Sequence, residues 1–313
     1  MYLCISPFAG IKKSYFMPIS DFRGLGVALI TPFKEDFSVD YEALSQLIKY
    51  HLSSGTDYIV ALGTTAETPT LTRKEKDEIV RFIVKEVNGK IPIVAGIGDN
   101  NTAALVEEIR SFDLTGISAI LSVTPYYNKP TQEGLFRHYC ALSGVSPVPV
   151  ILYNVPGRTG VNMTAGTTIR IANHCGNVIA IKEASADLKQ IDEIVRGAPD
   201  GFKVISGDDS VTTSVIELGG IGVISVFGNA FPKDMGRLVN SVLNGNFVDA
   251  RHEMEEEYGE LSRLIFLEGN PAGVKSILYQ LGKIKNILRL PLLPVSENTH
   301  MLIKSALEKI SVL

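Results

Sequence analysis

Short apolar runs rich in β-branched residues recur along this chain about every thirty residues, the length of one strand-plus-helix unit. The runs are Leu25–Thr31, Tyr58–Thr65, Ile91–Gly98, Ala119–Pro125, Pro149–Pro156, Val178–Ser185, Phe202–Asp209 and Gly222–Ala230. Strands this apolar, without tight hairpin signals between them, are typical of parallel strands covered by helices. Eight such units are the number that closes a (β/α)8 barrel.

The segments between the runs carry helix signals. Asp40 is a good N-cap after the first run, and Thr72–Glu75 has the capping-box pattern after the second. We therefore predict an α/β fold, a (β/α)8 TIM barrel. A doubly wound open sheet is the alternative, but the only approach to its dinucleotide fingerprint, Gly96–Gly98, has Asn101 where a third glycine is needed.

The pattern changes from about residue 246. Helical periodicity without intervening strands covers Arg251–Leu267, Pro271–Leu281 and Asn298–Ile310. We predict an N-terminal extension over residues 1–21, a catalytic barrel over 22–245 and a C-terminal helical domain over 246–313. The extension does not resemble a signal peptide, in which positive charges precede the apolar run, because its lysines follow its short apolar run. Met17 is an alternative start of the protein.

Composition excludes several classes of function. The net charge of −4 is small and has no basic stripe, so no nucleic-acid partner is expected. No apolar run reaches the roughly 18–20 residues of a membrane span. Three widely spaced cysteines without a C-x-x-C pattern predict free thiols in a reducing compartment, hence a cytoplasmic location. The five histidines lack metal-ligand spacing, so no metal is expected.

The sixth apolar run, N-V-I-A-I-K-E-A-S, contains an unexpected lysine, Lys182. Lysines at strand ends commonly extend into solvent. Strand alternation, however, places Val178 and Ala180 on the same face as Lys182. The larger aliphatics Ile179 and Ile181 then take the opposite face, which suits the helix layer. Lys182 is therefore predicted to point into the mouth of the barrel.

Residues with hydroxyl groups stand at the ends of three other predicted strands: Tyr153, Tyr127 and Thr64. Any one tyrosine at such a place more often packs than reacts, but a lysine near several hydroxyls suits covalent chemistry on a carbonyl. A neutral lysine amine forms a Schiff base, and hydroxyls can carry its protons. Arg158, in the loop after Tyr153, is either a solvated charge or a fork that binds a substrate carboxylate.

Several motifs resemble, in order and spacing, those of the dihydrodipicolinate synthase/N-acetylneuraminate lyase family. They are G-T-T-A-E, T-P-Y-Y-N-K-P, I-L-Y-N-V-P-G-R-T-G, I-K-E-A, S-G-D-D and G-V-I-S-V, and the resemblance extends over about residues 22 to 313. It is specific because so many motifs match collinearly. It implies a TIM-barrel lyase that uses pyruvate in class I aldolase chemistry, with no cofactor beyond the covalent imine.

The resemblance also implies roles for individual residues. Lys182 would form the Schiff base with pyruvate, and Tyr153 would act as general acid and base. Thr64 and Tyr127 would complete a proton relay, with Tyr127 or its neighbour Tyr126 reaching across a subunit interface. The family further implies a homo-oligomer, either a tetramer built as a dimer of dimers or the dimer alone.

The substrate-binding set implied by the family consists of Thr65, Arg158, Ile224 and Gly207. Thr65 would hold the pyruvate carboxylate, and Ile224 would line that pocket. An arginine in Y-N-V-P-G-R-T-G resembles the synthase branch, in which it binds the carboxylate of L-aspartate 4-semialdehyde on the pathway to diaminopimelate and lysine. A related lyase acting on a sugar acid, such as N-acetylneuraminate or a 2-keto-3-deoxy acid, is the alternative.

Two departures from the family pattern have consequences. The family commonly has glycine where Ala66 stands, so a positive φ at that position would strain the alanine. Relatives that lysine inhibits tend to carry a histidine and an acidic residue on the helices after the second and third strands. Lys76 and Ala104 stand at those positions here, which predicts weak or absent inhibition by lysine.

Overall fold

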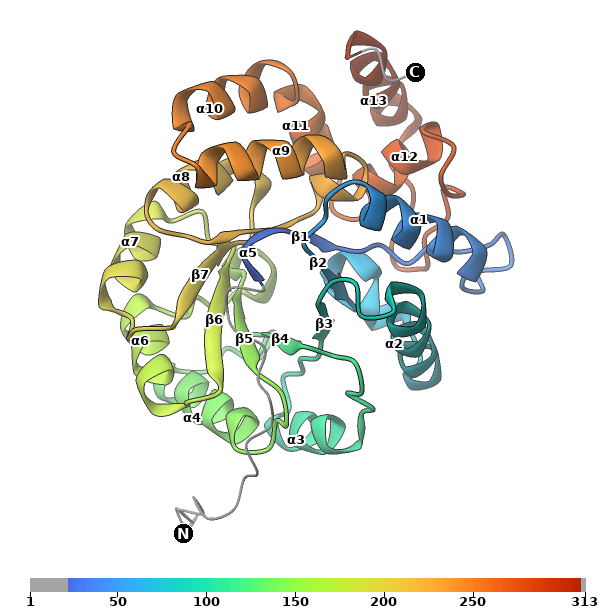
Figure 1. Ribbon diagram of the computed structural model, residues 1–313. Coiled ribbons are helices and arrows are strands. Elements are labelled where there is room, and N and C mark those ends of the chain that lie inside the picture. Colours follow the sequence, from blue (N-terminus) through green and yellow to red (C-terminus); the bar gives the residue numbers. More distant parts are fainter. Residues whose placement is uncertain (1–21, 311–313) are drawn as a thin grey trace.

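The computed structural model describes residues 22–310, and the predicted N-terminal extension, residues 1–21, lies outside them. Parallel strands close into a barrel in chain order, with β8 beside β1, inside a ring of helices (Figure 1). The strands are β1 (Gly24–Ala28), β2 (Tyr58–Ala61), β3 (Ile93–Gly96), β4 (Ala119–Val123), β5 (Val150–Asn154), β6 (Val178–Glu183), β7 (Lys203–Ser206) and β8 (Gly222–Ser225). The TIM-barrel prediction is confirmed.

Helices connect the strands and cover the barrel. They are α1 (Tyr41–Ser53), α2 (Arg73–Val87), α3 (Thr102–Ser111), α4 (Gln132–Ser143), α5 (Pro156–Thr159), α6 (Ala165–His174), α7 (Leu188–Gly197), α8 (Thr212–Glu217) and α9 (Pro232–Leu243). The Asp40 carboxylate accepts from the Ala43 amide at the start of α1, and Thr72 and Glu75 form a complete capping box at α2. Both predicted helix starts are therefore present.

The strands are shorter at their carboxyl ends than the apolar runs predicted. β2 ends at Ala61 instead of Thr65, and β8 ends at Ser225 instead of Ala230. Single 3₁₀ turns follow at once, η2 (Thr64–Ala66) and η5 (Phe227–Asn229). The runs continue past the strands because most residues of these turns, Thr65, Ala66 and Phe227–Asn229, are buried at the mouth of the barrel.

Two layers of core side chains lie on either side of the strands. The inner layer fills the barrel and includes Val60, Leu121, Ile151, Tyr153, Ala180, Ile205 and Ile224, while the outer layer packs the helices against the strands. Inner positions come from every strand, so the barrel interior is a packed core below its mouth.

At the start of β6, the prediction of which side chains face the barrel interior is wrong. Val178 lies in the outer layer, whereas Ile179 packs against the inner one. The reason is a bulge: β5 pairs Val150 with Val178 but Ile151 with Ala180, which leaves Ile179 as an extra residue. From Ala180 onward the alternation holds.

Residues 247–310 form helices without strands, as predicted, and are drawn orange to red in Figure 1. The elements are α10 (Phe247–Glu256), α11 (Gly259–Leu267), α12 (Ala272–Gln280) and α13 (Glu297–Lys309). The single helix predicted over Arg251–Leu267 is wrong, because the chain breaks at Tyr258, whose ring packs on Phe227 and Phe231. The boundary proposed at residue 246 stays a prediction.

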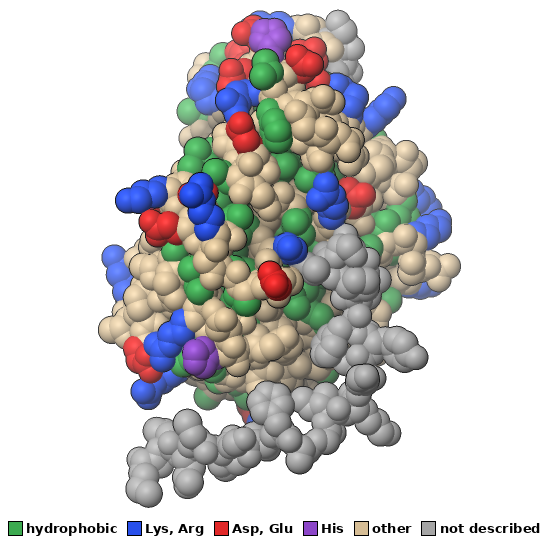
Figure 2. Space-filling view, turned by 60° about the vertical axis from the view of Figure 1, so that its left-hand side comes forward, with side chains coloured by type: hydrophobic (Ala, Val, Ile, Leu, Met, Phe, Trp, Pro, Cys, Tyr) green, Lys and Arg blue, Asp and Glu red, His purple; other side chains and the backbone are tan. Residues whose placement is uncertain are grey.

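Charged side chains of both signs are interspersed on the face shown in Figure 2, without a broad patch of one sign. Within residues 22–310, no helix is long and apolar enough to cross a membrane.

Candidate active site

Lys182 and Tyr153 are neighbours at the carboxyl ends of β6 and β5. The strand register pairs the two residues directly. Lys182 Nζ lies 4.5 Å from the centre of the Tyr153 ring, and the two side chains are 4% and 7% exposed. A buried amine next to a phenol is an arrangement that can support imine chemistry on a carbonyl.

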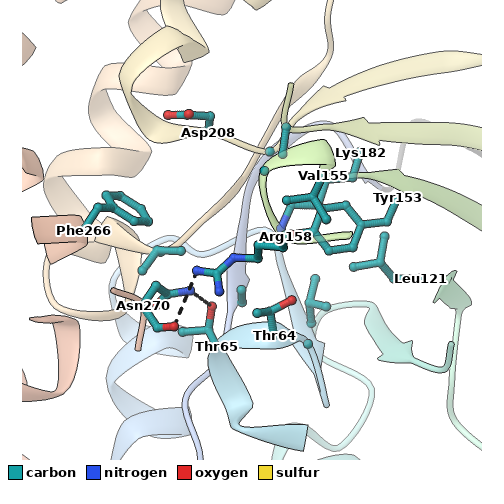
Figure 3. A pocket seen from close by; sticks show the side chains of 17 residues that line it. Thr64, Thr65, Leu121, Tyr153, Val155, Arg158, Lys182, Asp208, Phe266 and Asn270 are labelled. Carbon is teal, nitrogen blue, oxygen red and sulfur yellow. Dashed lines mark hydrogen bonds between the residues drawn. The ribbon is translucent and has the colours of Figure 1, made fainter. Parts of the chain in front are cut away.

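A pocket of about 400 Å³ opens above this pair at the mouth of the barrel. Its lining comes from strand ends, from the loops after them and from the C-terminal helices (Figure 3). The lining residues are Ala28, Val60, Gly63, Thr64, Thr65, Leu121, Tyr153, Val155, Gly157, Arg158, Lys182, Ala184, Gly207, Asp208, Val226, Phe266 and Asn270. A pocket of this size suits two small organic acids.

A buried polar network behind the barrel wall fixes the ends of β5 and β6. The Glu183 carboxylate accepts hydrogen bonds from Asn154 Nδ2 at 3.0 and 3.1 Å and from Gln190 Nε2 at 3.1 Å. Burial raises the pKa of Glu183, while these donors oppose the shift. Because Asn154 and Glu183 directly follow Tyr153 and Lys182, the network holds those two residues in register.

Gly207 allows the lysine side chain to pass close to β7. A Cβ at this position would lie 3.0 Å from Lys182 Cγ and 2.7 Å from the Ala184 Cβ. Any larger residue would therefore displace Lys182.

The turn after β2 presents Thr64 and Thr65 to the pocket from the 3₁₀ turn η2. Glu67, the residue directly after η2, has a left-handed backbone, with φ 56° and ψ 33°. Ala66 precedes it, inside η2, and its carbonyl accepts from the Thr31 hydroxyl at 2.9 Å. Ala66 does not have a positive φ, whereas Glu67 after it does, so the strain considered for Ala66 is absent.

Arg158 extends over the pocket from α5, and its guanidinium faces the C-terminal helices (Figure 3). Arg158 Nη2 lies 3.5 Å from the Asn270 carbonyl oxygen, and Asn270 Nδ2 donates to Thr65 Oγ1 at 2.9 Å. The side-chain oxygen of Asn270 is buried without a hydrogen-bond partner. The guanidinium keeps further donors for a carboxylate.

The structure brings together six of the eight predicted site residues around one pocket: Lys182, Tyr153, Thr64, Thr65, Arg158 and Gly207. Ile224 belongs to the packed inner layer and is 1% exposed. Tyr127 follows β4 with φ 71°, is 84% exposed, and does not line the pocket of its own chain. Its role across a subunit interface stays a prediction, because a single chain does not test it.

Sequence reasoning missed Asn270, Asp208 and Phe266 as pocket residues. Asp208 belongs to the S-G-D-D motif, and Asn270 opens the N-P-A-G-V-K motif, so both motifs carry a signal for these residues. Phe266, which is 41% exposed, gave no signal beyond helical periodicity. Within residues 22–310, no three His, Cys, Asp or Glu side chains gather as metal ligands would.

Comparisons with known proteins agree with this geometry. The family model described as the dihydrodipicolinate synthetase family matches residues 21–310. The 4-hydroxy-tetrahydrodipicolinate synthase of Parabacteroides distasonis is 53% identical over 290 residues, which is 93% of this chain and 97% of that protein.

Solved structures are similar throughout the chain. Dihydrodipicolinate synthase from Thermotoga maritima superposes with a TM-score of 0.90 at 41% identity, covering 93% of this chain and 99% of that one. The chloride-inhibited enzyme from Acinetobacter baumannii, complexed with pyruvate, gives a TM-score of 0.89 at 37% identity with the same coverage. Fold, site and relatives agree, and the chain belongs to the dihydrodipicolinate synthetase family.

Proposed function

We propose that this enzyme condenses pyruvate with L-aspartate 4-semialdehyde to give 4-hydroxy-tetrahydrodipicolinate, through a Schiff base on Lys182. The observation that carries the proposal is the buried lysine amine above the Tyr153 ring, in a pocket that also holds an arginine. The relative from Parabacteroides distasonis, named for this reaction, supports it over a sugar-acid lyase.

The first half of the proposed reaction activates pyruvate. The Lys182 amine attacks the ketone carbon, and loss of water leaves an imine. The imine withdraws electrons, so a proton leaves the methyl carbon and an enamine forms. Tyr153, whose ring lies 4.5 Å from Lys182 Nζ, would carry these protons, and Thr64 lines the same pocket. The threonine side chain of Thr65 offers a donor for the pyruvate carboxylate.

The second half joins the two substrates. The enamine carbon attacks the aldehyde carbon, a carbon–carbon bond forms, and the aldehyde oxygen takes a proton to become the hydroxyl. The amino group of the second substrate then attacks the imine carbon, which closes a six-membered ring and releases Lys182 as the free amine. No electron acceptor is required, because oxidation state is conserved over the whole sequence.

Borohydride trapping combined with a substrate panel tests the proposal. Reduction in the presence of pyruvate is expected to fix one pyruvate on Lys182, located by mass spectrometry of peptides. The enzyme should then turn over pyruvate with L-aspartate 4-semialdehyde, and not N-acetylneuraminate or 2-keto-3-deoxy acids. Absence of the adduct on Lys182 would remove the mechanism, and preferred cleavage of a sugar acid would select the alternative.

Arg158→Ala is expected to raise the KM for L-aspartate 4-semialdehyde by about 10–100-fold, the loss of a charge-assisted pair of hydrogen bonds. Pyruvate trapping on Lys182 should continue at the wild-type rate, because the arginine serves the second substrate. Arg158→Lys, which keeps the charge without the planar fork, should give an intermediate KM. Steady-state kinetics check this, and full turnover by the alanine variant would contradict the assignment.

Lysine is expected to inhibit this enzyme weakly or not at all. Lys76 on α2 is half-buried and Ala104 on α3 is exposed, so a cationic effector would meet a like charge and lack an acidic partner. Initial rates with increasing L-lysine measure this. Inhibition at micromolar lysine would overturn the prediction, and Lys76→His/Ala104→Glu is the variant that should gain sensitivity.

The proposed assembly is a homo-oligomer, a dimer or a tetramer made of two dimers. Tyr127 supports it, because a tyrosine that is 84% exposed with a left-handed backbone suits a contact with a second chain.

A further inference from the structure

A fully buried ion pair joins the turn after β2 to the C-terminal helices. Glu67 Oε1 accepts from Lys275 Nζ on α12, and neither side chain has any exposed surface. The two residues are 208 positions apart in the sequence. Charged side chains are rarely buried so completely unless they are paired.

Each member of the pair has further partners that fix its position. Lys275 Nζ also donates to the Ile287 carbonyl at 2.9 Å and lies 4.3 Å from the centre of the Phe33 ring. Glu67 Oε2 accepts from the Arg289 amide at 2.9 Å. Burial lowers the pKa of Lys275 to about 8, and the Glu67 carboxylate opposes that shift. Glu67 is thus held by the segment between α12 and α13 as well as by α12 itself.

The backbone at Glu67 makes this attachment relevant to the pocket. Its left-handed conformation, unusual for a residue with a side chain, ends the turn that presents Thr64 and Thr65. The Glu67 amide donates to the Thr64 carbonyl at 3.2 Å, and the Thr70 hydroxyl donates to the Glu67 carbonyl at 2.9 Å. A shift of the Glu67 side chain would therefore move the threonines with it.

A second contact acts on the same turn from the same side. Asn270, which precedes α12, donates to Thr65 Oγ1 at 2.9 Å (Figure 3). Lys275 lies five residues further along, in the first half of α12. The segment 270–275, which enters and begins α12, consequently contacts the turn at both Thr65 and Glu67.

We propose that Glu67 and Lys275 are positioning residues for the pyruvate-binding turn at Thr64 and Thr65. The C-terminal helices thereby complete the active site instead of only covering the barrel. This inference rests on the proposed function, since Thr64 and Thr65 matter only if pyruvate binds there.

The double variant Glu67→Gln/Lys275→Met tests the role with little risk to folding. It removes both charges at once, so no uncompensated charge remains buried. Glutamine keeps an oxygen for the Arg289 amide, and methionine keeps the aliphatic stem beside Phe33. Small displacements of a binding group cost up to about 100-fold. We expect a 10–100-fold rise in the KM for pyruvate and an equal fall in the borohydride trapping rate below saturation.

Three comparisons make the result specific. The KM for L-aspartate 4-semialdehyde should stay within about twofold, because its proposed ligand Arg158 lies on α5 and contacts the C-terminal segment at the Asn270 carbonyl, a backbone group that both substitutions leave in place. Ile303→Ala, a core truncation in α13, should lower the melting temperature without raising the KM for pyruvate. Glu67→Asp, which keeps the charge but shortens its reach, should raise the KM for pyruvate, and it replaces the double variant if that protein does not fold.

The outcomes separate the two hypotheses. Wild-type protein that forms no pyruvate adduct would overturn the proposed function. Wild-type trapping with unchanged trapping in the double variant would overturn only the positioning role. The positioning role would also be overturned if Ile303→Ala raised the KM for pyruvate as much as the double variant does, because lower stability would then explain the higher KM.

Discussion

Lys182→Gln is expected to lower kcat by about 10³-fold or more and to abolish the borohydride-dependent pyruvate adduct. Glutamine has nearly the length of lysine, but its amide nitrogen cannot form an imine. The barrel mouth is otherwise preserved, since Gly207 leaves room for the side chain and the Glu183 network holds the strand. The fall in kcat should therefore come from the missing amine and not from unfolding, so the melting temperature should stay close to that of the wild type.

Lys203→Gln is the matched control for this variant. Lys203 begins the neighbouring strand β7, at the end of the barrel opposite the pocket, and pairs with Ala180. It carries the same functional group without access to the pocket, so both kcat and the adduct on Lys182 should be retained. An adduct on another lysine in the Lys182→Gln protein, with turnover intact, would disprove the central role of Lys182.

The orientation of Lys182 was predictable because strand alternation is a local property. Every second residue of a strand lies on the same face, so Ile151 predicts the face of Tyr153, and Ala180 predicts that of Lys182. Both predicted residues face the inside of the barrel. The bulge at Ile179 was not predictable, since it depends on how β5 and β6 pair and not on either strand alone. Because the bulge precedes Ala180, the predicted orientation of Lys182 is still correct.

The part of the pocket made by the C-terminal helices could not be derived from periodicity. Asn270 reaches Thr65 across 205 residues of sequence, and Lys275 reaches Glu67 across 208. An amphipathic pattern shows which face of a helix is buried, but not what the buried face contacts. The predicted role of Tyr127 depends on a second chain. Its side chain is exposed on a single chain, and the sequence of one chain does not show which surface of another chain it would contact.

Tyr153→Phe is expected to lower kcat by about 10²–10⁴-fold, the usual contribution of a positioned general acid and base. The substitution removes only the hydroxyl and keeps the ring that lies 4.5 Å from Lys182 Nζ, so the amine retains its packing. The pyruvate adduct should still form on Lys182 after borohydride treatment, though more slowly. This separates the variant from Lys182→Gln, in which no adduct forms at all.

Tyr139→Phe provides the comparison for Tyr153→Phe. Tyr139, on α4, is fully buried in the outer layer, where its hydroxyl donates to the Ser122 carbonyl at 3.0 Å and contacts the backbone of Tyr153 from the side opposite its ring. Losing that hydrogen bond should cost about 1 kcal/mol of stability and leave kcat within about twofold of the wild type. A phenol hydroxyl would then affect turnover only where it lies beside the imine. Equal losses of kcat in the two variants would mean that packing, and not proton transfer, explains the need for Tyr153.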